Sequence, residues 1–124
     1  SYAPTTYGNP AYAAHIASHY KTPADPEKFD AHYFGTHIPL VQKIPGLVKV
    51  EVSCFTGKEA PYYLMATLYF NNREERKASL NSPEGKATST DLPNFAEASQ
   101  VTVAFADIVY TGIRAICTYN LGLF

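Results

Sequence analysis

Two alternating segments separated by a turn decide the fold: residues 48–55, VKVEVSCF, and residues 62–70, YYLMATLYF. In the first, valines alternate with lysine, glutamate and serine, which is typical of a strand with one face on a core. In the second, every other residue from Leu64 to Phe70 is apolar. Gly57 and Pro61 mark a turn between them. The pattern predicts two consecutive strands.

Helix and strand signals flank this pair on both sides. Asp25 before Pro26 is a good N-cap followed by proline at the first helical position. Asn72 with Glu75 three residues later resembles a capping box. The expected elements are a strand over 12–21, a helix over 26–43 that bends near Pro39, strands over 48–55 and 62–70, a helix over 73–80, a short helix or turn from 82 to 91–94, and a strand over 100–109.

The order β-α-β-β-α-β predicts an α+β, ferredoxin-like fold with a four-stranded antiparallel sheet and both helices on one face. Aromatic and polar side chains would lie on the other face: His15 or Tyr20, Lys49, Glu51, Ser53, Tyr63, Met65, Thr67 and Tyr69. Such a face is seldom left to water, and two sheets placed face to face would close a barrel. We therefore expect a homodimer.

Length and composition suit one ordered domain over 12–109, preceded by an arm over 1–11. A tail over 110–124 would form an edge strand or a dimer contact. Apolar residues make up 46% of the chain and charged residues 17%, which argues against disorder. The net charge of −1 gives no electrostatic signal for nucleic acid or an anionic membrane. Apolar runs are too short to span a bilayer. The two cysteines of the chain show no spacing that argues for a disulfide, so a reducing, cytoplasmic location is expected.

His37 is the first candidate catalytic residue. At 100° per residue it falls in the middle of the apolar stripe that includes Phe29 and Tyr33, whereas His32 falls about 60° outside it and is expected at the surface or an interface. An imidazole on a core face needs a hydrogen-bond partner or a cavity to work in. Pro39 is expected to end or bend the helix beside it and leave space there. A purely structural histidine is the competing interpretation.

The sequence offers further candidates for the same site. His19 and His15 are four apart on a strand and share one face, so either joins the site if that face lines the barrel. Asn94 and Phe95 follow a proline turn that is expected to border the pocket mouth. We expect no cofactor and no metal, because phosphate-loop and metal-ligand spacings are missing from the sequence. The candidate substrate-binding rings, for which plain packing is the alternative, are Tyr20, Tyr33, Tyr63, Tyr69 and Phe105.

An ordered series of short motifs resembles the EthD family: DPEKFDAHY (25–33), THIPL (36–40), IPGL (44–47), PYYL (61–64), LYF (68–70), SPEG (82–85) and DLPNF (91–95). The similarity covers residues 12–109. The resemblance implies a dimeric α+β barrel, and it places the histidine of the family's T-H-x-P-L motif at His37. The family takes its name from a protein encoded with an ether-degrading system, and its fold relatives include cyclases, cofactor-free monooxygenases, lyases and binding proteins.

Three functions follow from these expectations. The first is a cofactor-free enzyme that acts on a small apolar, aromatic or polyketide-like molecule, with His37 as general acid or base in a cyclase, lyase, dehydratase or monooxygenase reaction. The second is a non-catalytic binding or accessory protein for a small apolar metabolite of a degradation pathway. The third is a barrel filled by its own side chains.

Overall fold

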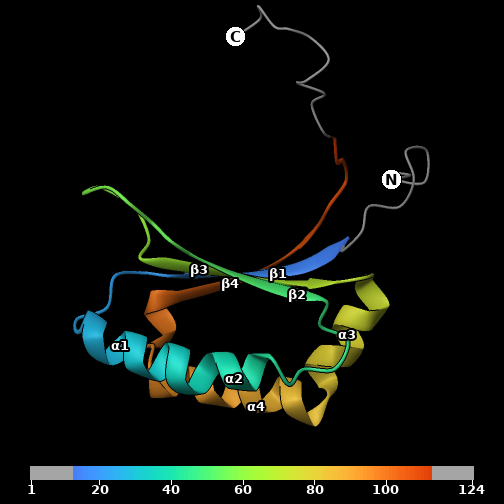
Figure 1. Cartoon of the computed structure of the whole chain (residues 1–124), viewed down its shortest axis with the longest axis horizontal. Helices are drawn as coiled ribbons and strands as arrows, with labels where there is room; N and C mark the ends of the chain where they lie inside the picture. Colours follow the sequence, from blue (N-terminus) through green and yellow to red (C-terminus); the bar gives the residue numbers. More distant parts are fainter. Residues whose placement is uncertain (1–12, 113–124) are drawn as a thin grey trace, which may run out of the picture.

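The computed structural model describes residues 13–112, which form a four-stranded sheet with helices packed on one side of it (Figure 1). The strands are β1 (Ala14–Tyr20), β2 (Lys49–Cys54), β3 (Leu64–Phe70) and β4 (Val101–Asp107). The helices are α1 (Pro26–His32), α2 (Ile38–Val41), α3 (Arg73–Asn81) and α4 (Pro83–Asp91), and a π-helical segment, Tyr33–His37, joins α1 to α2. Two 3-10 turns, Leu92–Asn94 and Ala98–Gln100, lead from α4 to β4. The predicted arm over 1–11 and tail residues 113–124 lie outside the described residues.

The strand order is β2-β3-β1-β4, and every neighbouring pair is antiparallel. The two central strands, β1 and β3, therefore lie between the edge strands β2 and β4. Together with the element order, this sheet confirms the predicted α+β, ferredoxin-like class.

The core lies between the sheet and the helices. Strand residues alternate between the two faces, and on the helix side Ile16, Tyr20 and Leu68 are buried. The strand pairing puts His15 on the opposite, open face beside Tyr69. Of the two residues left open for that face, His15 is the one found there, and Tyr20 belongs to the core.

The predicted capping signals form as hydrogen bonds. The Asp25 side chain accepts from the backbone N–H of Lys28 at 3.2 Å, and Asn72 accepts from that of Glu75 at 2.8 Å. Each satisfies a backbone donor that the first turn of a helix leaves unpaired. The starts of α1 and α3 are thus fixed by local sequence.

In the helix predicted over 26–43, the turn before Pro39 is a widened, π-helical turn over Tyr33–His37. The backbone N–H of Ile38 donates to the carbonyl of Tyr33, five residues earlier. In an α-helix the proline ring would press on the carbonyl of Gly35, and a π turn is one way to accommodate such an obstruction. The widened turn brings residues five apart toward the same face, which matters for His32 and His37.

Candidate active site

One buried carboxylate binds two imidazoles. Asp91, the last residue of α4, lies with one oxygen 3.0 Å from Nδ1 of His37. Nε2 of His32 lies 2.9 and 3.0 Å from the two oxygens of the same carboxylate. The Asn94 side-chain amide donates to it at 2.9 Å. These four residues, the Asp91 cluster, join the helix before β2 to the segment after α4.

The charge on Asp91 fixes the tautomer of His37. Burial acts to raise the pKa of Asp91, but hydrogen bonds from Asn94, His32 and His37 outweigh it and hold that pKa below its usual value. The ionised carboxylate only accepts, so Nδ1 of His37 donates and Nε2 keeps the lone pair of the neutral ring. Burial lowers the pKa of His37 more than Asp91 raises it. At neutral pH the ring is therefore an uncharged base.

A cavity of about 100 Å³ between the helices and the sheet has His37 in its wall. Tyr20 and Tyr33 also line it. Burial raises the pKa of both phenols, so their hydroxyls stay protonated and able to donate. Since a water occupies about 30 Å³ and ligand sites usually span about 300–1,000 Å³, this cavity has room for only the reactive part of an ordinary ligand.

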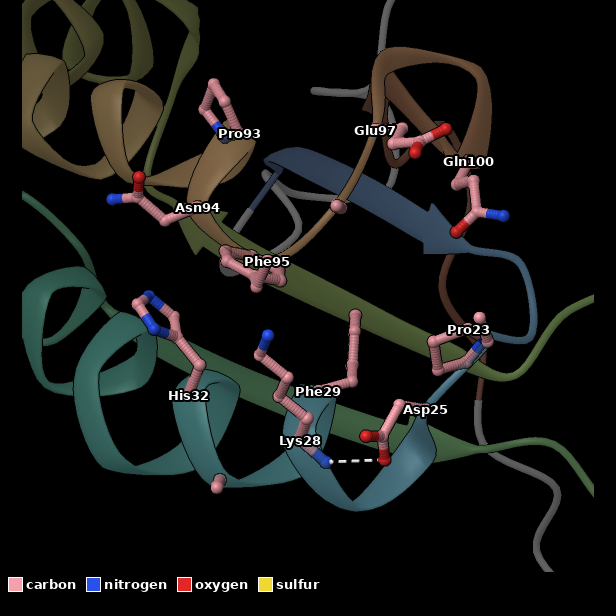
Figure 2. Close-up of a pocket in the computed structure, with 13 residues that line it drawn as sticks. Pro23, Asp25, Lys28, Phe29, His32, Pro93, Asn94, Phe95, Glu97 and Gln100 are labelled. Carbon is pink, nitrogen blue, oxygen red and sulfur yellow. Dashed lines mark hydrogen bonds between the residues drawn. The ribbon is translucent and has the colours of Figure 1, made fainter.

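A second, larger space lies on the outer side of the cluster. A groove of about 630 Å³ runs between α1 and the segment over 93–100. In Figure 2, Lys28, Phe29 and His32 project from α1 toward the segment that carries Phe95. The ring of Phe95 lies 5.4 Å from that of His32 and 4.7 Å from that of His37, between centroids. Phe95 therefore lies between the groove and His37.

The structure does not bring the two predicted catalytic histidines together. His19 lies on the open face of the sheet, where its ring is 4.9 Å from that of Tyr62. His37 lies on the helix side. Within one protomer they therefore do not form one site.

Three predicted substrate-binding rings also lie away from His37. Tyr69 is on the open face and donates to Glu51 at 2.8 Å. Tyr63, expected on the open face, lies just before β3, and its hydroxyl donates to Asp30 of α1 at 2.8 Å. That prediction of its face was wrong, because strict alternation does not extend beyond the strand end. Phe105 is 58% exposed on β4 and lines neither the cavity nor the groove.

His32 and Asp91 are the site residues that sequence reasoning missed. His32 was expected at the surface or an interface, but its side chain is 28% exposed and bonded to Asp91. The angular count assumed an α-helix, in which residues five apart lie about 140° apart. The π turn removes that assumption. Asp91 is the first residue of the DLPNF motif, so the sequence marked this position. Nothing in the motif indicated that His32 and His37 bind its carboxylate.

Neither a metal-binding cluster nor a membrane-spanning helix is found in the part of the chain that the structure describes. Within residues 13–112, no group of three or more His, Cys, Asp and Glu side chains is arranged to hold a metal ion. None of the helices found there is long and apolar enough to cross a bilayer.

The chain is similar to several known proteins. Residues 21–99 match the model of the EthD domain. An uncharacterized 11.0 kDa protein of the thcB-thcC intergenic region of Rhodococcus erythropolis is 38% identical, over 71% of this chain and 87% of its own. The crystal structure of an EthD family protein from Bacillus halodurans superposes with a TM-score of 0.73 at 32% identity, covering 77% of this chain and 98% of the other.

More distant structures share the fold. A dimeric ferredoxin-like protein of unknown function from Bacteroides fragilis has a TM-score of 0.57 at 16% identity, over 78% of this chain and 97% of its own. SnoaB, a cofactor-independent oxygenase from Streptomyces nogalater, has a TM-score of 0.60 at 13% identity, over 82% and 97%. The family model spans more than half of the chain, and the Rhodococcus protein is a close relative over most of both sequences. This chain therefore belongs to the EthD family.

Proposed function

We propose that this protein is a cofactor-free enzyme in which His37 moves a proton to or from a small apolar or aromatic molecule. The observation that carries the proposal is the buried hydrogen bond between Nδ1 of His37 and Asp91. A carboxylate on Nδ1 orients the ring and stabilises the imidazolium that forms when Nε2 takes a proton. His37 is then the general base and Asp91 the residue that positions it.

The surroundings of His37 favour proton transfer. His37 is only 4% exposed, and in such a buried site a charged partner acts more strongly than in water. Tyr33 stacks on His37 with centroids 5.4 Å apart, which holds the ring plane. Tyr20 and Tyr33, kept protonated by burial, are the candidates to donate to a substrate oxygen, and positioned acid–base groups typically contribute about 10²–10⁴-fold.

Several reactions fit this arrangement. Abstraction of a proton next to a carbonyl or from a phenol starts cyclisation, dehydration, bond cleavage or reaction of the resulting carbanion with oxygen. SnoaB, which shares the fold, is described as a cofactor-independent oxygenase. The shared fold favours a reaction without a cofactor, but it does not select one reaction among these.

The test measures proton transfer directly. Uncharged aryl ketones and 1,3-diketones are incubated with the protein in D₂O, and deuterium incorporation at carbon, above the rate measured without protein, is followed by mass spectrometry. We expect His37→Gln to reduce the catalysed exchange at least about 100-fold and Asp91→Asn at least about tenfold. Asp107→Asn, the same chemical change at the end of β4, serves as the matched control and should leave exchange unchanged. Equal exchange by the wild type and His37→Gln would remove His37 from the mechanism.

A carrier of a small apolar metabolite is the second candidate. The groove of about 630 Å³ favours it, because a binding protein needs room for a whole ligand rather than a reactive centre. It predicts a copurifying small molecule in native mass spectrometry, released unchanged, with no exchange in the D₂O assay.

We also propose that the protein is a homodimer closed through the open sheet face. That face carries stacked rings of His15 and Tyr69, 5.4 Å apart, and the Nδ1 atom of His15 is buried without a hydrogen-bond partner among residues 13–112. The Bacteroides protein of the same fold is described as dimeric. A stable monomer at micromolar concentration in sedimentation velocity would refute this proposal.

A further inference from the structure

We propose that the groove along α1 binds an uncharged aromatic molecule, which stacks on Phe95. This inference goes beyond the proposed function, because it concerns binding in the groove and is tested without turnover. At about 630 Å³ the groove lies within the range of small-molecule sites, about 300–1,000 Å³. The inner cavity of about 100 Å³ does not.

The groove is built before any ligand arrives. One backbone hydrogen bond ties the chain that leads from β1 toward α1 to the segment over 93–100: the N–H of Lys21 donates to the carbonyl of Gln100 at 2.9 Å. The segment that carries Phe95 is itself held by the N–H of Ala96, which donates to the carbonyl of Leu92 at 3.0 Å. A preformed site avoids the entropic cost of ordering loops on binding.

The groove offers an aromatic surface. Phe95 and Phe29 both line it, with ring centroids 5.4 Å apart at 72°. Pro23 and Pro93 add rigid apolar surface to the same lining. Aromatic rings prefer offset-stacked or edge-to-face contacts with other rings, so a planar ring is the ligand shape that this lining best accepts.

The charges of the lining disfavour an anion. One ammonium group, on Lys28, is opposed by the two carboxylates of Asp25 and Glu97, which leaves one net negative charge when His32 is neutral. Because like charges repel, a carboxylate or phosphate ligand pays an added cost here. The remaining polar lining groups are the neutral amides of Asn94 and Gln100, which suit hydroxyl and carbonyl substituents.

Phe95 separates the groove from His37. Its ring lines the groove and also lies 4.7 Å from the ring of His37. A molecule stacked on Phe95 is therefore one ring away from the candidate base, beyond hydrogen-bond reach of it. Phe95 is thus assigned as the residue that determines which molecules bind, distinct from the group that moves the proton.

Fluorescence titration tests the site, because the chain has no tryptophan to obscure the emission of a naphthalene. The probes are 2-naphthol, uncharged at pH 7, and 2-naphthoate, an anion of similar shape. We expect 2-naphthol to bind roughly two- to fivefold tighter than 2-naphthoate. Phe95→Ala should raise the dissociation constant of 2-naphthol roughly three- to tenfold. Phe55→Ala, the same change at a ring that lies near His19 on the open face, should leave it unchanged.

Two further variants separate this proposal from the proposed function. Glu97→Gln should reduce the difference in dissociation constant between 2-naphthol and 2-naphthoate, because it removes a carboxylate from the lining. His37→Gln should leave 2-naphthol binding within twofold while it abolishes deuterium exchange. Equal affinity for both probes, an unchanged dissociation constant in Phe95→Ala, or no binding at millimolar 2-naphthol would each overturn the groove proposal. None of those results would bear on the proposal that His37 is a general base, which the deuterium exchange assay tests separately.

Discussion

Burial of a neutral His37 should make the protein less stable as the pH falls below about 6.5. The pKa of His37 in the folded protein is below the ordinary value of 6.5, so the unfolded chain binds a proton more readily. For such a group stability is full above the unfolded pKa and is lost as the pH falls toward the folded pKa. If the ring is still neutral at pH 5.5, the loss between pH 7.5 and pH 5.5 reaches about 1.4 kcal/mol.

Titration of Asp91 does not contribute to the stability change between pH 7.5 and 5.5. Its folded pKa also lies below its ordinary value, and by the same sign its contribution is lost only as the pH falls below about 3.9. Between pH 7.5 and 5.5 the carboxylate stays ionised in both states. The change with pH therefore reports on histidines, and variants assign it to one of them.

The assay is urea unfolding followed by tyrosine fluorescence, at one protein concentration throughout because assembly also shifts stability. We expect the wild type to lose stability between pH 7.5 and 5.5, by at most about 1.4 kcal/mol through His37, and His37→Gln to lose much less. His19→Gln, on the open face, should retain the wild-type dependence. An equal loss in the wild type and His37→Gln, or a gain of stability by the wild type on acidification, would refute a buried neutral imidazole.

Three other outcomes follow from the same structure. Gly85→Ala should destabilise the protein by about 1–3 kcal/mol in urea unfolding, since an added Cβ would lie 2.9 Å from the backbone oxygen of Leu80; a neutral effect would contradict this packing of α4 on α3. Phe70→Ala should cost about 3–5 kcal/mol, because Phe70 is fully buried, and a loss below about 1 kcal/mol would place the core elsewhere. In ¹⁵N-resolved NMR, His37 should carry its proton on Nδ1 at pH 7.5 and lose that preference in Asp91→Asn; an Nε2 proton in the wild type would contradict the hydrogen bond drawn to Asp91.

Local sequence predicted most of the fold because each element has its own signal. Alternation defined β2 and β3 to within one or two residues, and the caps at Asp25 and Asn72 formed as expected. Faces were harder. A strand pattern assigns side chains only inside the pleat, and Tyr63, one residue before β3, turns toward Asp30 on α1 instead.

The site itself was only half predictable, and the reason lies in the geometry of one helical turn. The count at 100° per residue correctly put His37 on the buried face, but it put His32 elsewhere. Asp91 is 54 residues away from His37 in the sequence, so local periodicity cannot indicate that the two side chains pair. Only the three-dimensional structure identifies Asp91 as the partner of His37.

Pro39 explains why the two histidines meet at all. A proline inside a helix removes one donor and presses on the carbonyl four residues earlier, and here the chain answers by widening the turn over Tyr33–His37. Without that turn His32 and His37 would lie about 140° apart, too far around the helix to share Asp91. π turns are uncommon and are often found at functional sites, which fits a cost in helix geometry that is offset by the hydrogen bonds that the two imidazoles donate to the Asp91 carboxylate. The proline two residues after the histidine thus sets the backbone that the candidate active site requires.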